Sequence, residues 1–443
     1  MAEGLLMKDI GKMLMVLEAF FGGFYVAVTR NLFIPMLTYS GYSLQLLSYV
    51  TLAAALASIL VSYVIYQKPW IVESDMKLKL LLLHAMERFV WLSLPFMLNT
   101  PDLMIVVYSL AQTLTIPVGA LITVAMFSLY HENEFVDLTV KRTAASSAAS
   151  ILGMIFSTYV TASIVAPESY FIAYVTSALI GLISTTVLVP YNIPPNIVVD
   201  SNTSVSKEIE FKKINTYILF TFMMVGGNIL GLSWSPFLKN LNAPVYIAVG
   251  LSLAGSIGGT IGPYLWKGYR QYLIAIMFNI MVTTSVMFIT LPQVHLILSF
   301  LASMTFLGVN LLATSIYARY VKVLGVVKAS MFLTSANAVG LFIASFITSF
   351  ITSEPSTAII FSTIFRVLAL MVALLAIPET AVVPPATAYE FGRIVYSSSV
   401  LGYTFTVETS KNMIKFTFEV LALAFLLTFL YFIYRIAGFI VGA

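Results

Sequence analysis

The chain has 443 residues, of which 60% are hydrophobic and only 9% charged, and its formal net charge is +4. Soluble globular domains carry about a quarter charged residues, so this chain cannot cover a water-facing surface. A mean hydropathy of +0.96 predicts an all-α polytopic membrane protein. Little length remains for extramembrane domains, which excludes ATPase, kinase and nucleic-acid-binding modules.

Thirteen apolar segments are long enough to cross a membrane as helices, which need about 20 residues each. In chain order they are 13–37, 44–66, 80–98, 103–130, 144–165, 170–189, 217–238, 245–266, 272–291, 296–320, 329–351, 357–377 and 414–441. Runs this long and continuously apolar satisfy their backbone groups in lipid only as helices. The first run is too long for a cleaved signal peptide and lacks a small-residue cleavage site, so we expect it to be retained.

Lys and Arg residues lie almost entirely at one set of alternating helix ends. Over the first twelve segments that set holds fifteen basic residues, whereas the opposite set holds only Lys239. Because short cytoplasmic loops are enriched in basic residues, we expect a cytoplasmic N-terminus and a cytoplasmic middle loop. The thirteenth segment then places the C-terminus outside. The sequence therefore predicts a multi-pass protein of the plasma membrane.

Small residues recur at regular intervals along the chain. Ala, Gly and Ser are concentrated in segments 44–66, 144–165, 245–266 and 329–351, and Gly pairs occur at Gly22–Gly23 and Gly226–Gly227. Small residues let membrane helices approach closely, and this spacing is typical of transporters built from three-helix repeats. We expect four regions: a six-helix bundle (1–190), a cytoplasmic linker (191–214), a second six-helix bundle (215–377) and an interfacial segment with an extra membrane helix (378–443).

Over 13–377 the chain resembles the major facilitator superfamily. The resemblance rests on the topology, on the stretch from His84 to Trp91, and on two loops that resemble the family's cytoplasmic loops. It implies two pseudo-symmetric six-helix bundles and secondary transport by alternating access. The residues that it implies for gating are Asp137, Arg142, Lys267, Gly268 and Arg270. Trp266 stands where the family's signature has an acid.

Ionisable residues inside the segments are candidates for function, because such groups are costly at membrane depth. They are Glu18, Arg30, Glu87, Arg88 and Arg366. One hypothesis is that the three arginines line a central cavity and bind an anionic solute, with Glu87 or Glu18 coupling transport to protons. The other is that these groups form structural ion pairs within each half, or that Arg30 snorkels to the interface.

Several neutral polar residues extend the candidate solute site. Asn228 follows the second Gly pair, where the backbone could open toward a ligand, and Trp234 and Asn310 are further candidates. The absence of Cys and the presence of only three His exclude thiolate metal sites, iron–sulfur clusters and bis-His haems. No nucleophile–base arrangement occurs within the segments. We therefore expect no metal, no cofactor and no enzymatic activity.

The C-terminal region leaves a second function open. The thirteenth segment is rich in Phe, Leu and Tyr and poor in small residues, which suits contact with lipid or with a partner subunit. The sequence thus predicts a transporter of a small, anionic solute, or alternatively a non-transporting structural subunit of a larger membrane complex. Expected partners are membrane lipids, the solute and a membrane protein docked on the C-terminal helix, with no nucleic acid.

Overall fold

The computed structural model describes residues 2–68, 75–130, 132–191, 193, 207–266, 269–324, 326–377 and 380. The helices are α1 (Ala2–Tyr39), α2 (Leu44–Gln67), α4 (Met76–Ser93), η1 (Leu94–Met97), α5 (Pro101–Leu129), α6 (Glu132–Ser163), α7 (Glu168–Leu188), α8 (Lys207–Asn240), α9 (Val245–Leu265), α10 (Tyr269–Ser285), α11 (Val294–Leu324), α12 (Val326–Phe346), η2 (Ile347–Ile351) and α13 (Pro355–Ala376). One α-helix corresponds to each of the first twelve predicted segments, although α10 ends at Ser285, before the predicted end at 291. The thirteenth segment and the predicted interfacial segment lie outside the described residues.

By length and composition, nine helices in the described ranges could cross a membrane. The remaining apolar stretches, such as Val294–Asn310 and Ser335–Ile351, are shorter. No strand occurs in the part of the chain that is described. The protein is therefore an all-α, multi-pass membrane protein, as the composition predicted.

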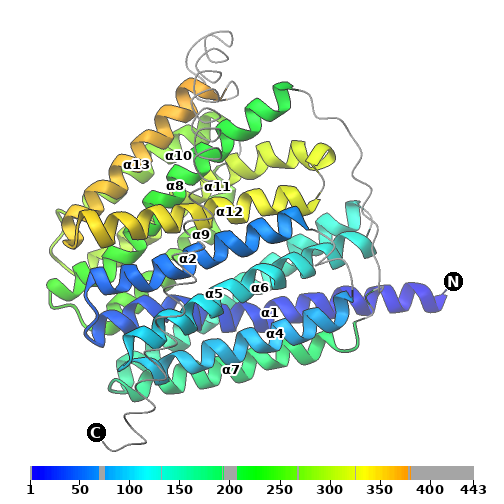
Figure 1. Cartoon of the computed structure of the whole chain (residues 1–443), viewed down its shortest axis with the longest axis horizontal. Coiled ribbons are helices and arrows are strands. Elements are labelled where there is room, and N and C mark those ends of the chain that lie inside the picture. The colour runs from blue at the N-terminus through cyan, green and yellow to red at the C-terminus, as the bar shows by residue number, and fades with distance from the viewer. Residues whose placement is uncertain are drawn as a thin grey trace, which may run out of the picture.

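The helices form two sets that lie side by side (Figure 1). The N-terminal helix set comprises α1, α2 and α4–α7, and the C-terminal helix set comprises α8–α13. Between the sets, α2 packs against α12 and α6 packs against α9. These are the four helices in which the sequence concentrates Ala, Gly and Ser, and the structure places them in two facing pairs.

The closest backbone approaches, however, occur within each set. A Cβ atom at Gly23 of α1 would lie 2.6 Å from the carbonyl oxygen of Ser146 in α6. Gly258 of α9 lies in the same way against the backbone of Phe300 in α11. Much of the small-residue pattern therefore serves packing inside the sets rather than between them.

Polar contacts join the two sets at the end of the molecule where α1 leads into α2. Across this end, which we call the α1–α2 end, Ser48 Oγ donates to Thr348 Oγ1 at 2.7 Å. Tyr39 Oη donates to the carbonyl oxygen of Ala243 at 2.7 Å. The turn before α2 depends on Gly41, whose φ of +99° lies in the region that favours glycine. The two sets are thus held together at this end by short hydrogen bonds.

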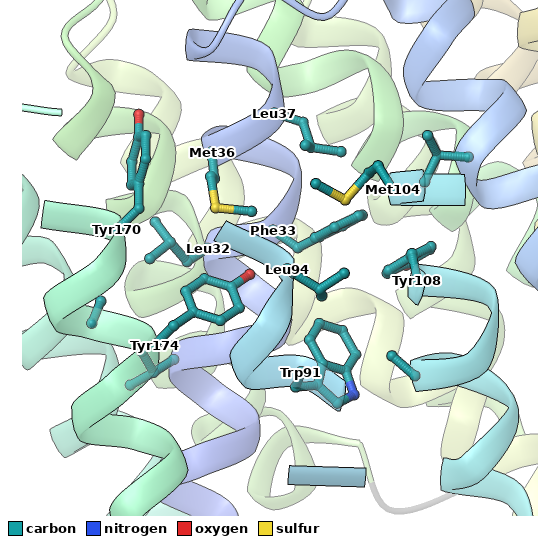
Figure 2. Close-up of a cluster of buried hydrophobic side chains, with 14 of the residues drawn as sticks. Leu32, Phe33, Met36, Leu37, Trp91, Leu94, Met104, Tyr108, Tyr170 and Tyr174 are labelled. Carbon is teal, nitrogen blue, oxygen red and sulfur yellow. The ribbon is translucent and has the colours of Figure 1, made fainter. Parts of the chain in front are cut away.

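A cluster of buried hydrophobic side chains with an aromatic core stabilises the N-terminal helix set (Figure 2). Phe33 of α1 stacks on Tyr108 of α5, with ring centroids 3.9 Å apart. Trp91 of α4 meets both rings edge-on. The guanidinium carbon of Arg30 lies 5.9 Å from the Trp91 ring centroid. The cluster thus fixes α1, α4 and α5 around the position from which Arg30 projects.

Candidate functional site: three adjoining cavities

Three adjoining cavities lead from the N-terminal helix set across the boundary into the C-terminal helix set. The N-set cavity, of about 500 Å³, lies among α1, α4, α5 and α6. The central cavity, of about 610 Å³, lies between the sets. The C-set cavity, of about 470 Å³, lies among α8, α9, α11 and α13. Arg30 lines the first two cavities, and Asn228 and Trp234 line the last two, so the three adjoin one another.

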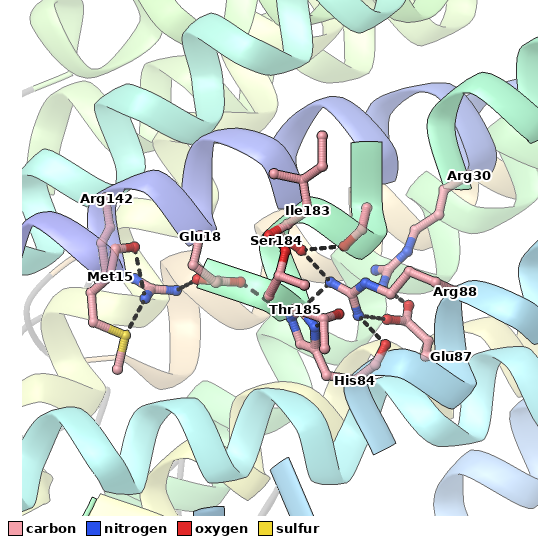
Figure 3. Close-up of polar contacts among 12 residues, drawn as sticks. Met15, Glu18, Arg30, His84, Glu87, Arg88, Arg142, Ile183, Ser184 and Thr185 are labelled. Atoms are coloured by element: carbon pink, nitrogen blue, oxygen red, sulfur yellow. Dashed lines mark hydrogen bonds and ion pairs between the residues drawn. The ribbon is translucent and has the colours of Figure 1, made fainter. Parts of the chain in front are cut away.

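A network of charged side chains borders the N-set cavity (Figure 3). An Nη atom of Arg142 in α6 lies 2.8 Å from Glu18 Oε2 in α1. Glu18 Oε1 lies 3.4 Å from His84 Nε2 in α4. Arg142 was predicted to act in a gating loop, but here its long side chain is the counter-charge of a buried carboxylate.

His84 has both ring nitrogens engaged. Its Nε2 lies 2.8 Å from an Nη atom of Arg88, and its Nδ1 lies 2.7 Å from Thr185 Oγ1. The same Nε2 atom also lies 3.4 Å from Glu18 Oε1, so His84 stands between a guanidinium and a carboxylate. It is a buried residue with both ring nitrogens in polar contacts, and it positions Arg88.

Glu87 accepts from two arginines on different helices. One carboxylate oxygen pairs with Arg88, and the other lies 3.3 Å from an Nη atom of Arg30. The Glu87 side chain is only 3% exposed, whereas that of Arg30 is 37% exposed. In the whole network, three arginines oppose two carboxylates, which leaves one positive charge in excess. Arg30 is the arginine that also borders the central cavity.

Arg366 of α13 lines the C-set cavity and is 2% exposed. One of its Nη atoms donates to the side-chain oxygen of Asn279 in α10. The amide of Asn279 donates to Ala302 O and to Thr305 Oγ1, each at 2.8 Å, which turns its oxygen toward Arg366. The Nε atom of Arg366 is buried without a hydrogen-bond partner. Among the residues described, no carboxylate lies within ion-pair distance of it.

Trp234 of α8 borders both the central and the C-set cavity. Its indole N–H donates to His295 Nδ1 at 3.0 Å. His295 Nε2 lies 3.0 Å from the carbonyl oxygen of Ile289 and therefore carries the ring proton. These two hydrogen bonds hold the indole in one orientation.

The other predicted residues lie in several places. Asn228 lines the central and C-set cavities, but α8 is a continuous helix there and its backbone does not open. Asn310 lines none of the three cavities. Arg270 is exposed near the start of α10, and Asp137 pairs with Lys141 at 2.8 Å on the surface. Lys267 and Gly268 lie outside the described residues.

Sequence comparisons find no relative: no family model and no curated protein matches the chain. Solved structures do match. The crystal structure of the nucleoside transporter NupG aligns with a TM-score of 0.58 and 14% identity, over 82% of this chain and 97% of that chain. A D-xylose–proton symporter aligns with a TM-score of 0.61 and 11% identity, over 84% and 98%.

A third match is a bacterial homologue of the human lysosomal transporter Spinster, in an inward-facing and unoccupied conformation. It aligns with a TM-score of 0.56 and 11% identity, over 83% of this chain and 95% of that chain. All three matches extend over nearly the whole length of the solved chains. Together with the two helix sets, they show that this chain has the fold of the major facilitator transporters.

Proposed function

We propose that the protein is a secondary transporter that moves a small anionic solute across the plasma membrane by alternating access. The observation that carries this proposal is Arg366, a buried cation beside a cavity with no carboxylate partner in the described ranges. A buried charge without a counter-charge is costly, and an ionisable residue at membrane depth is functional by default. A bound anion would supply the missing charge.

The N-set network supports the same solute charge. Its one excess positive charge belongs to a group of three arginines, of which Arg30 also borders the central cavity. Glu87 keeps Arg88 as a partner if Arg30 turns toward a solute. Arg30 could therefore bind an anion without leaving a carboxylate unpaired. Arg88, Asn228 and Trp234 complete the proposed solute path, and Glu18 and Glu87 are the proposed proton-coupling groups.

Alternating access requires that one end of the molecule opens when the other closes. If the N-terminus is cytoplasmic, as the Lys and Arg distribution predicts, the α1–α2 end faces outward. The hydrogen bond between Ser48 and Thr348 then closes the outer end, and the described conformation is inward-facing. In this proposal the halves 1–190 and 215–377 rock about the cavities, and Asp137, Arg142, Lys267, Gly268 and Arg270 gate the inner end.

One observation favours the alternative, a non-transporting structural subunit. Trp266, at the position of the family's signature acid, donates its indole N–H to the carbonyl oxygen of Met304 at 2.7 Å. It thereby ties the end of α9 to α11 instead of offering a charge to a gate. The proposed partner-binding segment, 414–441, lies outside the described residues. We favour transport because a structural subunit has no need of an uncompensated cation beside a cavity.

Reconstitution into proteoliposomes tests the proposal. Uptake of a panel of labelled small carboxylates, phosphate and sulfate would be measured for the wild type, for Arg366→Gln and for Lys68→Gln, a control at an exposed basic residue. We expect uptake of at least one anion by the wild type and by the control, and its loss in Arg366→Gln. Absence of uptake of every anion by a correctly folded protein would favour the structural subunit.

A further inference from the structure

The C-set cavity combines one cation with aromatic walls. Arg366 lies on α13, Trp234 on α8 and Phe306 on α11, and all three line the same space of about 470 Å³. Small-molecule sites in proteins are typically about 300–1,000 Å³, mostly apolar, with a few polar groups that fix the orientation of the ligand. The cavity has the size and the composition of such a site.

The charge of the lining limits the charge of the ligand. Among the described residues, Arg366 is the one charged side chain that lines the C-set cavity, and its neutral polar neighbours include Asn228 and Ser303. A monoanion would neutralise the guanidinium, whereas a dianion such as phosphate would bring an uncompensated negative charge into a largely apolar space. A neutral solute would leave Arg366 without a counter-charge. The lining therefore matches a monoanion.

The aromatic walls limit the shape of the ligand. Trp234 is held by the hydrogen bond from its indole N–H to His295. The ring of Phe237 contacts His295 in turn, with the two ring centroids 5.7 Å apart. An indole held in this way lines the cavities without the entropy cost of ordering on binding. Aromatic rings prefer offset or edge-to-face contact with other rings. These aromatic walls therefore favour a ligand that contains a flat ring.

We propose that the C-set cavity is the binding site for a small aromatic monocarboxylate, with the carboxylate at Arg366 and the ring against Trp234 and Phe306. This inference rests on the proposed function, in that it names the class of anion. The solute would enter from the central cavity, since Asn228, Trp234 and Ser303 border both spaces. His295 is a positioning residue that acts through Trp234.

Equilibrium binding of radiolabelled benzoate to the purified full-length protein tests this site. Acetate supplies the charge without the ring, benzamide supplies the ring without the charge, and inorganic phosphate supplies a larger charge. We expect benzoate to bind at least about tenfold more tightly than any of the three, because acetate and phosphate lack the ring contacts and benzamide lacks the charge that pairs with Arg366.

Variants then separate the ring from the charge. Trp234→Leu should weaken benzoate about tenfold and leave acetate unchanged, while Trp234→Phe should retain most of the benzoate affinity. Phe278→Leu, on the exposed face of α10, is the matched control and should behave as the wild type. If Trp234→Leu does not fold, Phe306→Leu, measured in the same way, replaces it with the same expectation.

The outcomes distinguish the two proposals. Suppose that acetate or phosphate binds as tightly as benzoate, and that Trp234→Leu and Phe306→Leu leave benzoate binding intact. The proposed aromatic site is then wrong, but the proposal of anion transport stands. Binding of benzamide as tight as that of benzoate would also overturn the monocarboxylate assignment. If no anion binds and Arg366→Gln changes nothing, the proposed function itself fails.

Discussion

The two helix sets bury arginine side chains in opposite ways. In the N-terminal set, Glu87 lies between Arg30 and Arg88, and Glu18 pairs with Arg142. In the C-terminal set, the partner of Arg366 among the described residues is the amide oxygen of Asn279. The same kind of residue at similar depth is thus paired in one half and uncompensated in the other. We infer from this difference that the paired arginines stabilise the fold in addition to any contact with solute, whereas the uncompensated one is available to a ligand alone.

The contrast rests on the cost of breaking a buried pair. Removing one partner of a buried ion pair typically costs 3–5 kcal/mol, because a charge is left without compensation. Removing Arg366 instead eliminates a charge that has no carboxylate partner among the described residues. Substitutions in the first half should therefore reduce stability, and substitutions in the second should reduce solute binding.

The largest effect is expected from Glu87→Gln. This change leaves Arg30 and Arg88 without their shared carboxylate, and we expect a loss of about 3–5 kcal/mol of stability. Thermal unfolding of the purified protein measures it. Glu354→Gln, at an exposed position before α13, is the control and should unfold as the wild type does. Equal stability of the two variants would contradict the assignment of Glu87 as a structural partner.

Arg366→Gln should have the next largest effect, on binding instead of stability. Hydrogen bonds to charged groups contribute about 1.5–3 kcal/mol, so we expect anion affinity to fall by about 10- to 100-fold. Its unfolding temperature should stay at or above that of the wild type. A strong loss of stability in Arg366→Gln would contradict the proposed difference, in which Arg366 serves binding and the paired arginines serve stability.

Opening of the α1–α2 end should be affected more weakly. Ser48→Ala removes one hydrogen bond between the sets and should shift the balance away from the described conformation by about 1 kcal/mol. The chain contains no Cys, so the double variant Ser48→Cys with Thr348→Cys offers a clean measurement. Its disulfide should block transport, and a reductant should restore it. Free transport by the oxidised protein would show that this end need not open.

The smallest effect on stability is expected at the surface. The pair between Asp137 and Lys141 is largely exposed on both sides, and such pairs contribute about 0.2–1 kcal/mol. Asp137→Asn should therefore leave unfolding nearly unchanged. Uptake kinetics of this variant test the proposed gating role separately, since a gating residue alters the maximal rate. Lys141→Gln is the control, because it removes the same ion pair but keeps Asp137.

Much of the fold follows from the sequence, because hydrophobic length and small-residue spacing are local properties. The apolar segments matched the helices from α1 to α13, and the helices rich in Ala, Gly and Ser face one another in pairs. The close approach of Gly23 to Ser146 within one set was not predicted. A small residue signals close packing, but its sequence position does not say which neighbour it meets.

The candidate site was predicted less completely, because pairing depends on side-chain reach between distant helices. Arg142 lies near a loop in the sequence, yet its guanidinium reaches Glu18, which is more than a hundred positions away. In the sequence, Asn279 looks like any other polar residue in an apolar segment. The structure shows that its side chain contacts Arg366. Asn310 has the same character but lies away from the cavities. Residue type alone could not separate these two asparagines.

Stabilisation of the protein by anions tests the central claim most directly. A ligand that binds only the folded state raises the unfolding temperature further as its concentration rises above its dissociation constant. Wild type and Arg366→Gln would therefore be compared over a concentration series of benzoate, acetate and phosphate. We predict that at least one anion, benzoate most strongly, stabilises the wild type and that no anion stabilises Arg366→Gln. Equal stabilisation of both proteins would contradict the claim that Arg366 binds the solute.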